Sequence, residues 1–232
     1  MAEQRGDVRG VATVGGGTGA LGRAVVDRLA ADGWSVVVPV RRPPDADLPA
    51  GVTAVPCDLR NSAEVAALAR AVAEIGPWRA VVNASGGYAG GEAHRIDDEE
   101  MIEHLELNLL GPWRLARAGA RAMIDQGGGG RIVNVGSRAA VDVAPGQAAY
   151  QLAKAGLLRL TEVMALELRE HGITVNAVLP SIMDTPANRF AMPGADHSRW
   201  VPVERVATTI AWLLSPDADI VSGGAIPVYG RA

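Results

Sequence analysis

The chain has 232 residues, of which 48% are hydrophobic and 21% are charged, a balance that is typical of globular proteins and excludes a disordered chain. The formal net charge of −4 leaves no excess of positive charge for a phosphate backbone, which argues against a nucleic-acid partner. No run of apolar residues approaches the roughly 20 of a membrane span, and no signal peptide is recognisable, so a cytoplasmic protein without membrane contact is predicted. A single cysteine, Cys57, excludes an internal disulfide and a Cys-based zinc site, and no metal is expected.

Short β-branched runs alternate with longer alanine- and leucine-rich stretches along the chain. The runs predict strands at 11–14, 35–40, 52–57, 80–83, 131–136, 173–179 and 225–228. The longer stretches predict helices at 20–31, 62–74, 97–125, 148–171 and 204–214. The strand runs are continuously apolar, as in strands that are buried on both faces. Strands that alternate with helices predict a single α/β domain over 1–232: a Rossmann-type, doubly wound parallel sheet of about seven strands with helices on both faces.

One stretch, 184–203, has no clear periodicity and contains three prolines, Pro186, Pro193 and Pro202. A long irregular segment in a compact domain usually has a functional role. It follows the end of a strand, which predicts a substrate loop over a pocket at about 186–203. The alternative is a surface loop without function.

A glycine-rich turn joins the first predicted strand to the first helix, and reads Gly15-Gly16-Gly17-Thr18-Gly19-Ala20-Leu21-Gly22. Glycines three residues apart let the backbone turn sharply, and they let a pyrophosphate approach the main-chain N–H groups at the positive end of the helix. The position after a strand and before a helix therefore predicts dinucleotide binding. The alternative is a turn that serves only helix–strand packing.

The end of the second strand indicates which dinucleotide binds. An NAD site usually places a carboxylate there for the ribose 2′-hydroxyl, whereas this chain has Arg41 and Arg42 after Val40. Guanidinium groups suit a 2′-phosphate, so NADP(H) is favoured and NAD(H) is kept as the alternative. The two arginines can also be solvated turn residues. Asp58, which follows the third strand, is expected to accept a hydrogen bond from the adenine amino group.

Four polar residues predict the reaction chemistry. Tyr150 and Lys154 are four apart on a predicted helix, so they share a face, and the ammonium is expected to lower the pKa of the phenol. Ser137 follows a strand and is placed to hold a substrate carbonyl. Asn108 is unfavourable in the middle of a helix, so it is expected to hold a water molecule that links the lysine to solvent. Each residue alone is equally well explained by a surface or capping role.

The order and spacing of these motifs resemble those of the short-chain dehydrogenases/reductases over nearly the full length of the chain. The matching segments are 16–22, Asn83-Ala84-Ser85-Gly86, Leu107-Asn108-Leu109, 130–137, Tyr150 with Lys154, 175–178 and 180–185. The resemblance implies a catalytic tetrad of Asn108, Ser137, Tyr150 and Lys154. The chain departs from the family pattern at Gly15, Ala20, Ala84 and Ser181, and none of these departures removes a reacting group.

The resemblance also implies the binding residues. Cofactor contacts are expected from Gly16, Gly17, Thr18, Gly19, Ala20, Leu21, Gly22, Arg41, Arg42, Asp58, Leu59, Asn83, Ala84, Ser85, Tyr150, Lys154, Pro180, Met183 and Thr185. The substrate pocket is expected to use Gly87, Tyr88, 138–147 and 186–200, with an apolar wall of Phe190, Met192 and Trp200. A homodimer or homotetramer is expected from the same resemblance.

The function that follows is NADPH-dependent reduction of a small-molecule ketone to an alcohol, with Tyr150 as proton donor. The stretch 184–200 resembles dihydropteridine reductases, which use NADH and lack the tetrad serine, so pterin reduction is one alternative. Ser137 and Arg41 argue against it. An epimerase or dehydratase would have a longer C-terminal substrate region. A non-catalytic NADP(H)-sensing module would have lost Tyr150 or Lys154.

Overall fold

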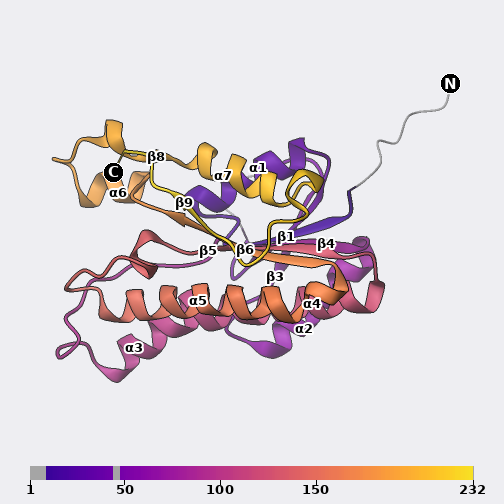
Figure 1. The fold of residues 1–232 in the computed structure, drawn as a ribbon, viewed down its shortest axis with the longest axis horizontal. Helices are drawn as coiled ribbons and strands as arrows, with labels where there is room; N and C mark the ends of the chain where they lie inside the picture. The colour runs from indigo at the N-terminus through magenta and orange to yellow at the C-terminus, as the bar shows by residue number, and fades with distance from the viewer. Residues whose placement is uncertain (1–8, 44–47, 232) are drawn as a thin grey trace.

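The computed structural model describes residues 9–43 and 48–231. Its main sheet has seven parallel strands in the order β3-β2-β1-β4-β5-β6-β9 (Figure 1). These strands are β1 (Val11–Gly15), β2 (Ser35–Val40), β3 (Val52–Pro56), β4 (Trp78–Asn83), β5 (Gly130–Val135), β6 (Ile173–Pro180) and β9 (Ala225–Val228). The predicted fold class is confirmed.

The helices form one layer on each face of the sheet (Figure 1). One layer consists of α1 (Ala20–Ala31) and α7 (Val203–Leu213). The other contains α2 (Ser62–Ile75), α3 (Asp98–Leu105), α4 (Gly111–Gln126) and α5 (Ala148–Glu167). Because both faces are covered, β1, β2, β4 and β6 are almost entirely buried, which explains their continuously apolar sequences.

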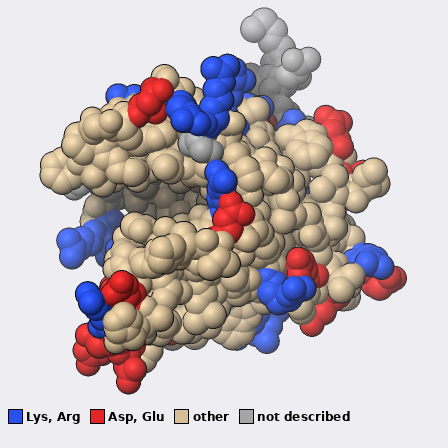
Figure 2. Space-filling model, turned by 60° about the vertical axis from the view of Figure 1, so that its left-hand side comes forward, with Lys and Arg blue, Asp and Glu red and all other residues tan. Residues whose placement is uncertain are grey.

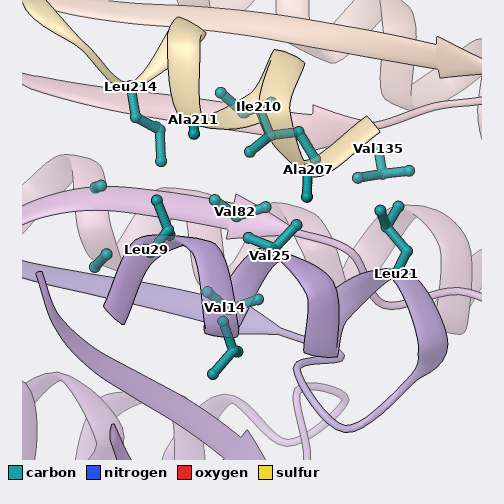
Figure 3. Close-up of a cluster of buried hydrophobic side chains, with 14 of the residues drawn as sticks. Val14, Leu21, Val25, Leu29, Val82, Val135, Ala207, Ile210, Ala211 and Leu214 are labelled. Atoms are coloured by element: carbon teal, nitrogen blue, oxygen red, sulfur yellow. The ribbon is translucent and has the colours of Figure 1, made fainter. Parts of the chain in front are cut away.

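A separate hydrophobic core fills the space between the sheet and each helix layer. Figure 3 shows the core under α1 and α7, where Val25, Leu29 and Ile210 gather over strand residues such as Val82. All four are 1% exposed or less. Burial of each such side chain stabilises the fold by roughly 1.5–3 kcal/mol, so these layers hold the strand ends firmly in place.

The strand order reverses beside β1, which pairs with β2 on one side and β4 on the other. Ala12 lies opposite Val36 of β2 and Ala80 of β4. β1 leads into α1 on one face of the sheet, and β4 leads into α3 and α4 on the other, which opens a crevice at the carboxyl ends of the strands. The glycine-rich turn and the ends of β2, β4, β5 and β6 all meet at this edge of the sheet.

The long helix predicted over 97–125 extends from Asp98 to Gln126, but it is not a regular α-helix throughout. The helix is interrupted by a π-helical turn, η1 (Glu106–Leu110), between α3 and α4, and Asn108 is in that turn. Pro112 prevents regular α-helical bonding here, because it has no N–H to donate and its ring would clash with the carbonyl of the residue four positions earlier, Asn108. The amide of Gly111 instead donates to the carbonyl of Glu106.

The prediction of an irregular stretch over 184–203 is also wrong in part. The segment contains α6 (Pro186–Ala191) and a 3₁₀ turn, η4 (His197–Arg199), and the strands β7 (Met183–Asp184) and β8 (Val201–Pro202) pair with each other. The hydroxyl of Thr185 accepts a hydrogen bond from the Asn188 amide and caps α6, while Pro186 occupies its first turn.

Candidate active site

Two cavities lie at the carboxyl edge of the sheet, on either side of the glycine-rich turn. The first has a volume of about 730 Å³, begins at the end of β2 and includes Gly17 and Thr18 of the turn. The second has a volume of about 750 Å³, includes Leu21, and extends past the ends of β5 and β6. Figure 2 shows this hollowed side of the molecule, with basic side chains gathered near its top.

The glycines of the turn serve different purposes. Gly16 has a φ of +76°, and a Cβ atom there would meet the backbone of Ser85, so this glycine lets β1 and the end of β4 approach closely. A Cβ at Gly22 would lie 2.0 Å from the carbonyl oxygen of Gly16. At Gly19, by contrast, a Cβ would meet only that oxygen, at 3.4 Å. Gly19 is also the N-cap of α1, which has no side-chain cap, so no side chain satisfies the first amides of this helix.

We predict that Gly22→Ala unfolds at a melting temperature at least about 6 °C lower than that of the wild type. The new methyl group overlaps backbone atoms that cannot move aside, so a cost of about 3 kcal/mol or more is expected, at 2–4 °C per kcal/mol. Gly19→Ala is the matched control and is expected to keep the wild-type melting temperature while binding NADPH more weakly. Thermal unfolding and fluorescence titration measure the two effects. Equal melting temperatures for the two variants would contradict this account of the turn.

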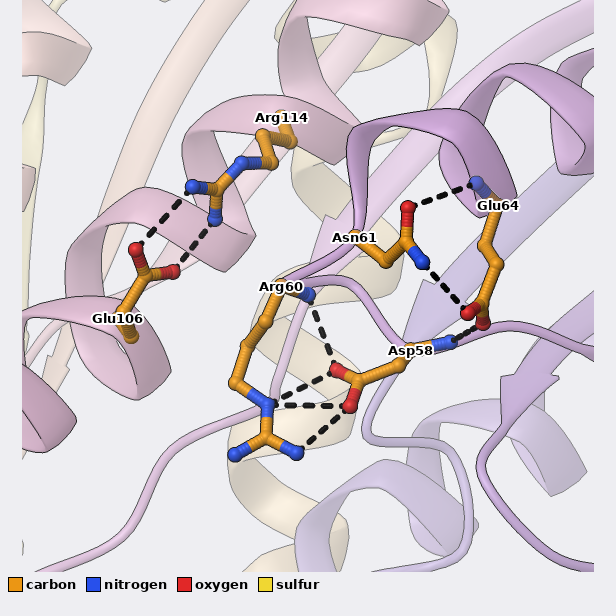
Figure 4. Close-up of polar contacts among 6 residues, drawn as sticks. All are labelled: Asp58, Arg60, Asn61, Glu64, Glu106 and Arg114. Atoms are coloured by element: carbon orange, nitrogen blue, oxygen red, sulfur yellow. Dashed lines mark hydrogen bonds and ion pairs between the residues drawn. The ribbon is translucent and has the colours of Figure 1, made fainter.

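The first cavity is lined by four arginines, Arg23, Arg41, Arg42 and Arg60, and one carboxylate, Asp58. The Arg60 guanidinium donates to both oxygens of Asp58, at distances from 2.6 to 3.0 Å (Figure 4). These bonds keep the pKa of Asp58 below its usual value. The predicted adenine contact of Asp58 stays a prediction, and it would have to share this carboxylate with Arg60. Sequence reasoning missed Arg23 and Arg60, although Arg60 lies only two residues after Asp58.

All four tetrad residues line the second cavity. Ser137 follows β5, while Tyr150 and Lys154 lie in the first two turns of α5, so strand and helix converge on one point. The Lys154 ammonium donates to the carbonyl of Val135 at 2.9 Å and lies 5.9 Å from the centroid of the Tyr150 ring. The Tyr88 ring meets that of Tyr150 edge-on, with centroids 5.2 Å apart.

Asn108 is fully buried, and its side-chain amide is held by the protein. Its Nδ2 donates to the carbonyls of Gly87, at 3.1 Å, and His104, at 3.2 Å, while its Oδ1 accepts from the amide of Gly87 at 3.2 Å. A Cβ at Gly86 would lie 2.8 Å from Asn108 Oδ1 and 3.3 Å from Lys154 Nζ. Gly86 therefore leaves both groups on one wall of the cavity, and the water link predicted for Asn108 stays a prediction.

The electrostatics of the tyrosine differ from the sequence-based expectation. Burial raises the pKa of Tyr150, and the group that opposes this rise is the hydroxyl of Ser137, through a hydrogen bond, rather than Lys154. Burial also lowers the pKa of Lys154, from an ordinary 10.5 to about 8. The expectation that the ammonium lowers the tyrosine pKa fails because desolvation acts on both groups and dominates at this depth.

The predicted cofactor residues fall into three groups. Gly17, Thr18, Arg41, Arg42 and Asp58 line the first cavity. Leu21, Ala84, Ser85, Tyr150, Lys154, Pro180, Met183 and Thr185 line the second. Gly16, Gly19, Ala20, Gly22, Leu59 and Asn83 line neither. Asn83 is fully buried and donates to Pro112 and Asn134, so it fastens β4 to its neighbours. The Leu59 side chain packs near Gly15.

The predicted apolar wall of the substrate pocket is correct only for Met192, which lines the second cavity. Trp200 is 6% exposed, packs against the tilted ring of His197 with centroids 4.3 Å apart and lines neither cavity, so it anchors the segment. Phe190 is 90% exposed and lines neither cavity. Sequence reasoning missed Ile182, which lines the cavity between Ser181 and Met183.

Comparison with known proteins decides the family. The family model described as short chain dehydrogenase matches residues 10–194. The chain belongs to the short-chain dehydrogenase family. A 3-oxoacyl-(acyl-carrier-protein) reductase MabA of Mycobacterium tuberculosis is 32% identical, over 96% of this chain and 92% of the relative. A putative ketoacyl reductase of Streptomyces coelicolor is 32% identical, over 95% of both chains. A solved structure of an actinorhodin polyketide ketoreductase variant with NADPH superimposes with a TM-score of 0.86, at 30% identity over 95% of this chain and 96% of that one.

As a short-chain dehydrogenase, the protein is an oxidoreductase that uses a nicotinamide cofactor. Its own residues fit such a dinucleotide. The N-terminus of α1 has no side-chain cap and lies next to Gly17 and Thr18, which line the first cavity, so its amides suit a pyrophosphate. Ser85 lines the second cavity, and its buried hydroxyl oxygen has no hydrogen-bond partner among the described residues.

Among residues 9–43 and 48–231, no group of three or more histidine, cysteine, aspartate or glutamate side chains is arranged to hold a metal ion. Within the part of the chain that the structure describes, no helix combines the length and the apolarity that a membrane crossing requires.

Proposed function

We propose that this short-chain dehydrogenase reduces a ketone to an alcohol with NADPH, and that Tyr150 donates the proton. The observation that carries the proposal is the convergence of Ser137, Tyr150 and Lys154 on one cavity beside the glycine-rich turn. Relatives named as ketoreductases and 3-oxoacyl reductases, one of them solved with NADPH, support it.

In this proposal, each catalytic residue acts at one atom of the substrate or cofactor. The hydroxyls of Ser137 and Tyr150 hold the carbonyl oxygen, and Tyr150 gives it a proton as the oxygen gains negative charge. When bound, the nicotinamide supplies the hydride that the carbonyl carbon accepts. Lys154 holds the cofactor ribose, and because burial lowers its pKa to about 8, it can give up a proton near neutral pH to restore the phenol.

The substrate portion of the second cavity has mixed character. Tyr88, Ile182 and Met192 give it apolar surface, and Gln147 and Asn188 give it amide groups. Arg138, which lines this cavity, forms an ion pair with Asp142, and Arg189, which follows the lining residue Asn188, forms one with Asp184. These ion pairs neutralise the local charge, which favours a neutral ketone over an anionic one.

Initial rates of nicotinamide oxidation test the function. The panel contains aliphatic, aromatic and β-keto substrates and a quinonoid dihydropterin, each with NADPH and with NADH. Reduction of ketones with a preference for NADPH is the expected result. Turnover of the pterin alone would overturn the proposal in favour of pterin reduction, and no turnover with any substrate would leave only cofactor binding.

We predict that Arg41→Ser lowers the preference for NADPH over NADH by about 10–100-fold in kcat/KM. Arg41 directly follows β2 and lines the first cavity, where a guanidinium can hold a 2′-phosphate through charge-assisted hydrogen bonds worth roughly 1.5–3 kcal/mol. The matched control is Arg70→Ser, an exposed arginine of α2 that lines neither cavity. An unchanged cofactor ratio in Arg41→Ser would show that the phosphate is held elsewhere.

A further inference from the structure

A half-buried ion pair spans the π-helical turn that carries Asn108. Glu106 is the first residue of η1, and its carboxylate accepts both terminal N–H groups of Arg114, at 2.6 and 3.2 Å. The side chain of Arg114 is only 13% exposed, and that of Glu106 is 26% exposed. Figure 4 shows the two side chains facing each other across the turn. Two parallel bonds fix both the distance and the orientation of the pair.

The spacing of the pair depends on the π turn. In a regular α-helix, residues eight apart are separated by about 800°, which is about 80° beyond two full turns. A π turn absorbs one extra residue. Eight residues then cover about the angle that seven cover in an α-helix, which is close to two turns. Glu106 and Arg114 therefore project from one face only while the extra residue is present, so the ion pair favours the π turn over a regular helix.

The same turn determines where the Asn108 amide lies. Its three hydrogen bonds, to the backbone of Gly87 and to the carbonyl of His104, require the side chain to point from the turn toward the loop after β4. If the π turn were replaced by regular α-helix, the segments on either side would rotate by about 100° relative to each other. Asn108 would then lose its place beside Lys154.

Pro112 alone does not determine this geometry. It prevents one regular hydrogen bond, but a kink or a frayed turn satisfies that requirement as well as a π turn does. The bidentate pair selects one of these arrangements, because only a defined rotation brings the carboxylate and the guanidinium together.

We propose that Glu106 and Arg114 are positioning residues, whose ion pair holds the π turn in register and thereby places the Asn108 amide at the wall of the active site. Neither side chain lines the two cavities, so the pair acts through Asn108 rather than on the substrate. The catalytic consequence rests on the proposed reductase function, whereas the structural consequence does not.

The test compares Arg114→Met with the wild type by two readouts. The first is amide hydrogen exchange in the protein without cofactor, which is expected to speed up at least about tenfold at Gly87 and Gly111 and to stay unchanged in β5. The second is ketone reduction, in which kcat is expected to fall about 10–100-fold with little change in the KM for NADPH, since displacements of about 1 Å have effects of this size. Arg114→Lys keeps the charge without the planar fork and is expected to recover part of both losses.

Two further variants keep the test decisive. Arg28→Met is the matched control, because Arg28 forms an ion pair with Asp32 on α1, away from η1, and it is expected to leave both readouts at wild-type values. If Arg114→Met fails to fold, Glu106→Gln is tested instead, since it keeps the shape of the side chain and removes the charge.

Wild-type exchange at Gly87 together with a wild-type kcat would overturn the proposal. A wild-type protein that reduces no ketone, but whose variants show the faster exchange, would overturn the proposed function and leave the positioning role standing.

Discussion

Replacing Tyr150 with phenylalanine is expected to lower kcat for ketone reduction about 1,000-fold, within the range for loss of a general acid, while the Kd for NADPH changes little. Phenylalanine keeps the ring and its edge-on contact with Tyr88, so the cavity keeps its shape and only the proton donor is lost. Steady-state kinetics and fluorescence titration of the cofactor measure the two quantities.

The pKa of Tyr150 gives the same prediction a pH signature. Burial raises this pKa above its ordinary value of 10, so Tyr150 stays protonated across the neutral range. Deprotonation of Tyr150 should therefore not lower the reduction rate of the wild type between pH 6 and pH 9. Tyr229→Phe, which removes a hydroxyl outside the two cavities, serves as the control. A Tyr150→Phe enzyme with full activity would remove this residue from the mechanism.

Replacing Lys154 with methionine is expected to abolish turnover and also to change how stability depends on pH. Lys154 is 4% exposed, and its folded-state pKa of about 8 lies below the ordinary 10.5. Between these two pH values the unfolded chain binds more protons than the folded one, so the wild type gains stability as pH rises. Each pKa unit is worth about 1.4 kcal/mol, which predicts a gain of about 3 kcal/mol from pH 7 to 10.5 that the methionine variant lacks.

Urea unfolding of both proteins at pH 7 and pH 10.5, followed by circular dichroism, measures this difference. All other titrating groups are common to the two chains, so their contributions largely cancel in the comparison. Arg159→Met, an exposed position on the same helix, is the control and should follow the wild type. A parallel pH dependence for the wild type and Lys154→Met would show that the buried ammonium has an ordinary pKa.

The sheet could be predicted from the sequence because its signal is local. The strands covered on both faces contain runs such as Val36-Val37-Val38, and each such run lies in a strand of the structure. The glycine turn was predictable for the same reason, since a strand, a spaced set of glycines and a helix are adjacent in the chain.

The errors arose where a single residue outweighed the pattern around it. The alanine- and leucine-rich composition around Pro112 predicts a regular α-helix, whereas that proline removes one of its hydrogen bonds and the helix contains a π turn just before it. Thr185 followed by Pro186 is a readable helix start, but the short helix that it begins has no apolar stripe to reveal it. Trp200 and Phe190 were expected at the pocket because they are large and apolar, and residue type alone does not determine which way a side chain points.

The pKa of Tyr150 could not be predicted because desolvation depends on everything packed around a group. The i, i+4 spacing correctly places Tyr150 and Lys154 on one face of α5. It does not reveal that the ammonium turns to the carbonyl of Val135 or that both groups are removed from water. The balance between attraction and burial appears only in three dimensions.

Lys154 is the single lysine of these 232 residues, and it lies in α5 with its side chain enclosed by the fold. A lysine-specific endoprotease therefore has one bond to cut, between Lys154 and Ala155, and it reaches that bond only when the helix leaves the sheet. Cleavage by such an enzyme provides this chain with an intrinsic, label-free reporter of how often its centre opens.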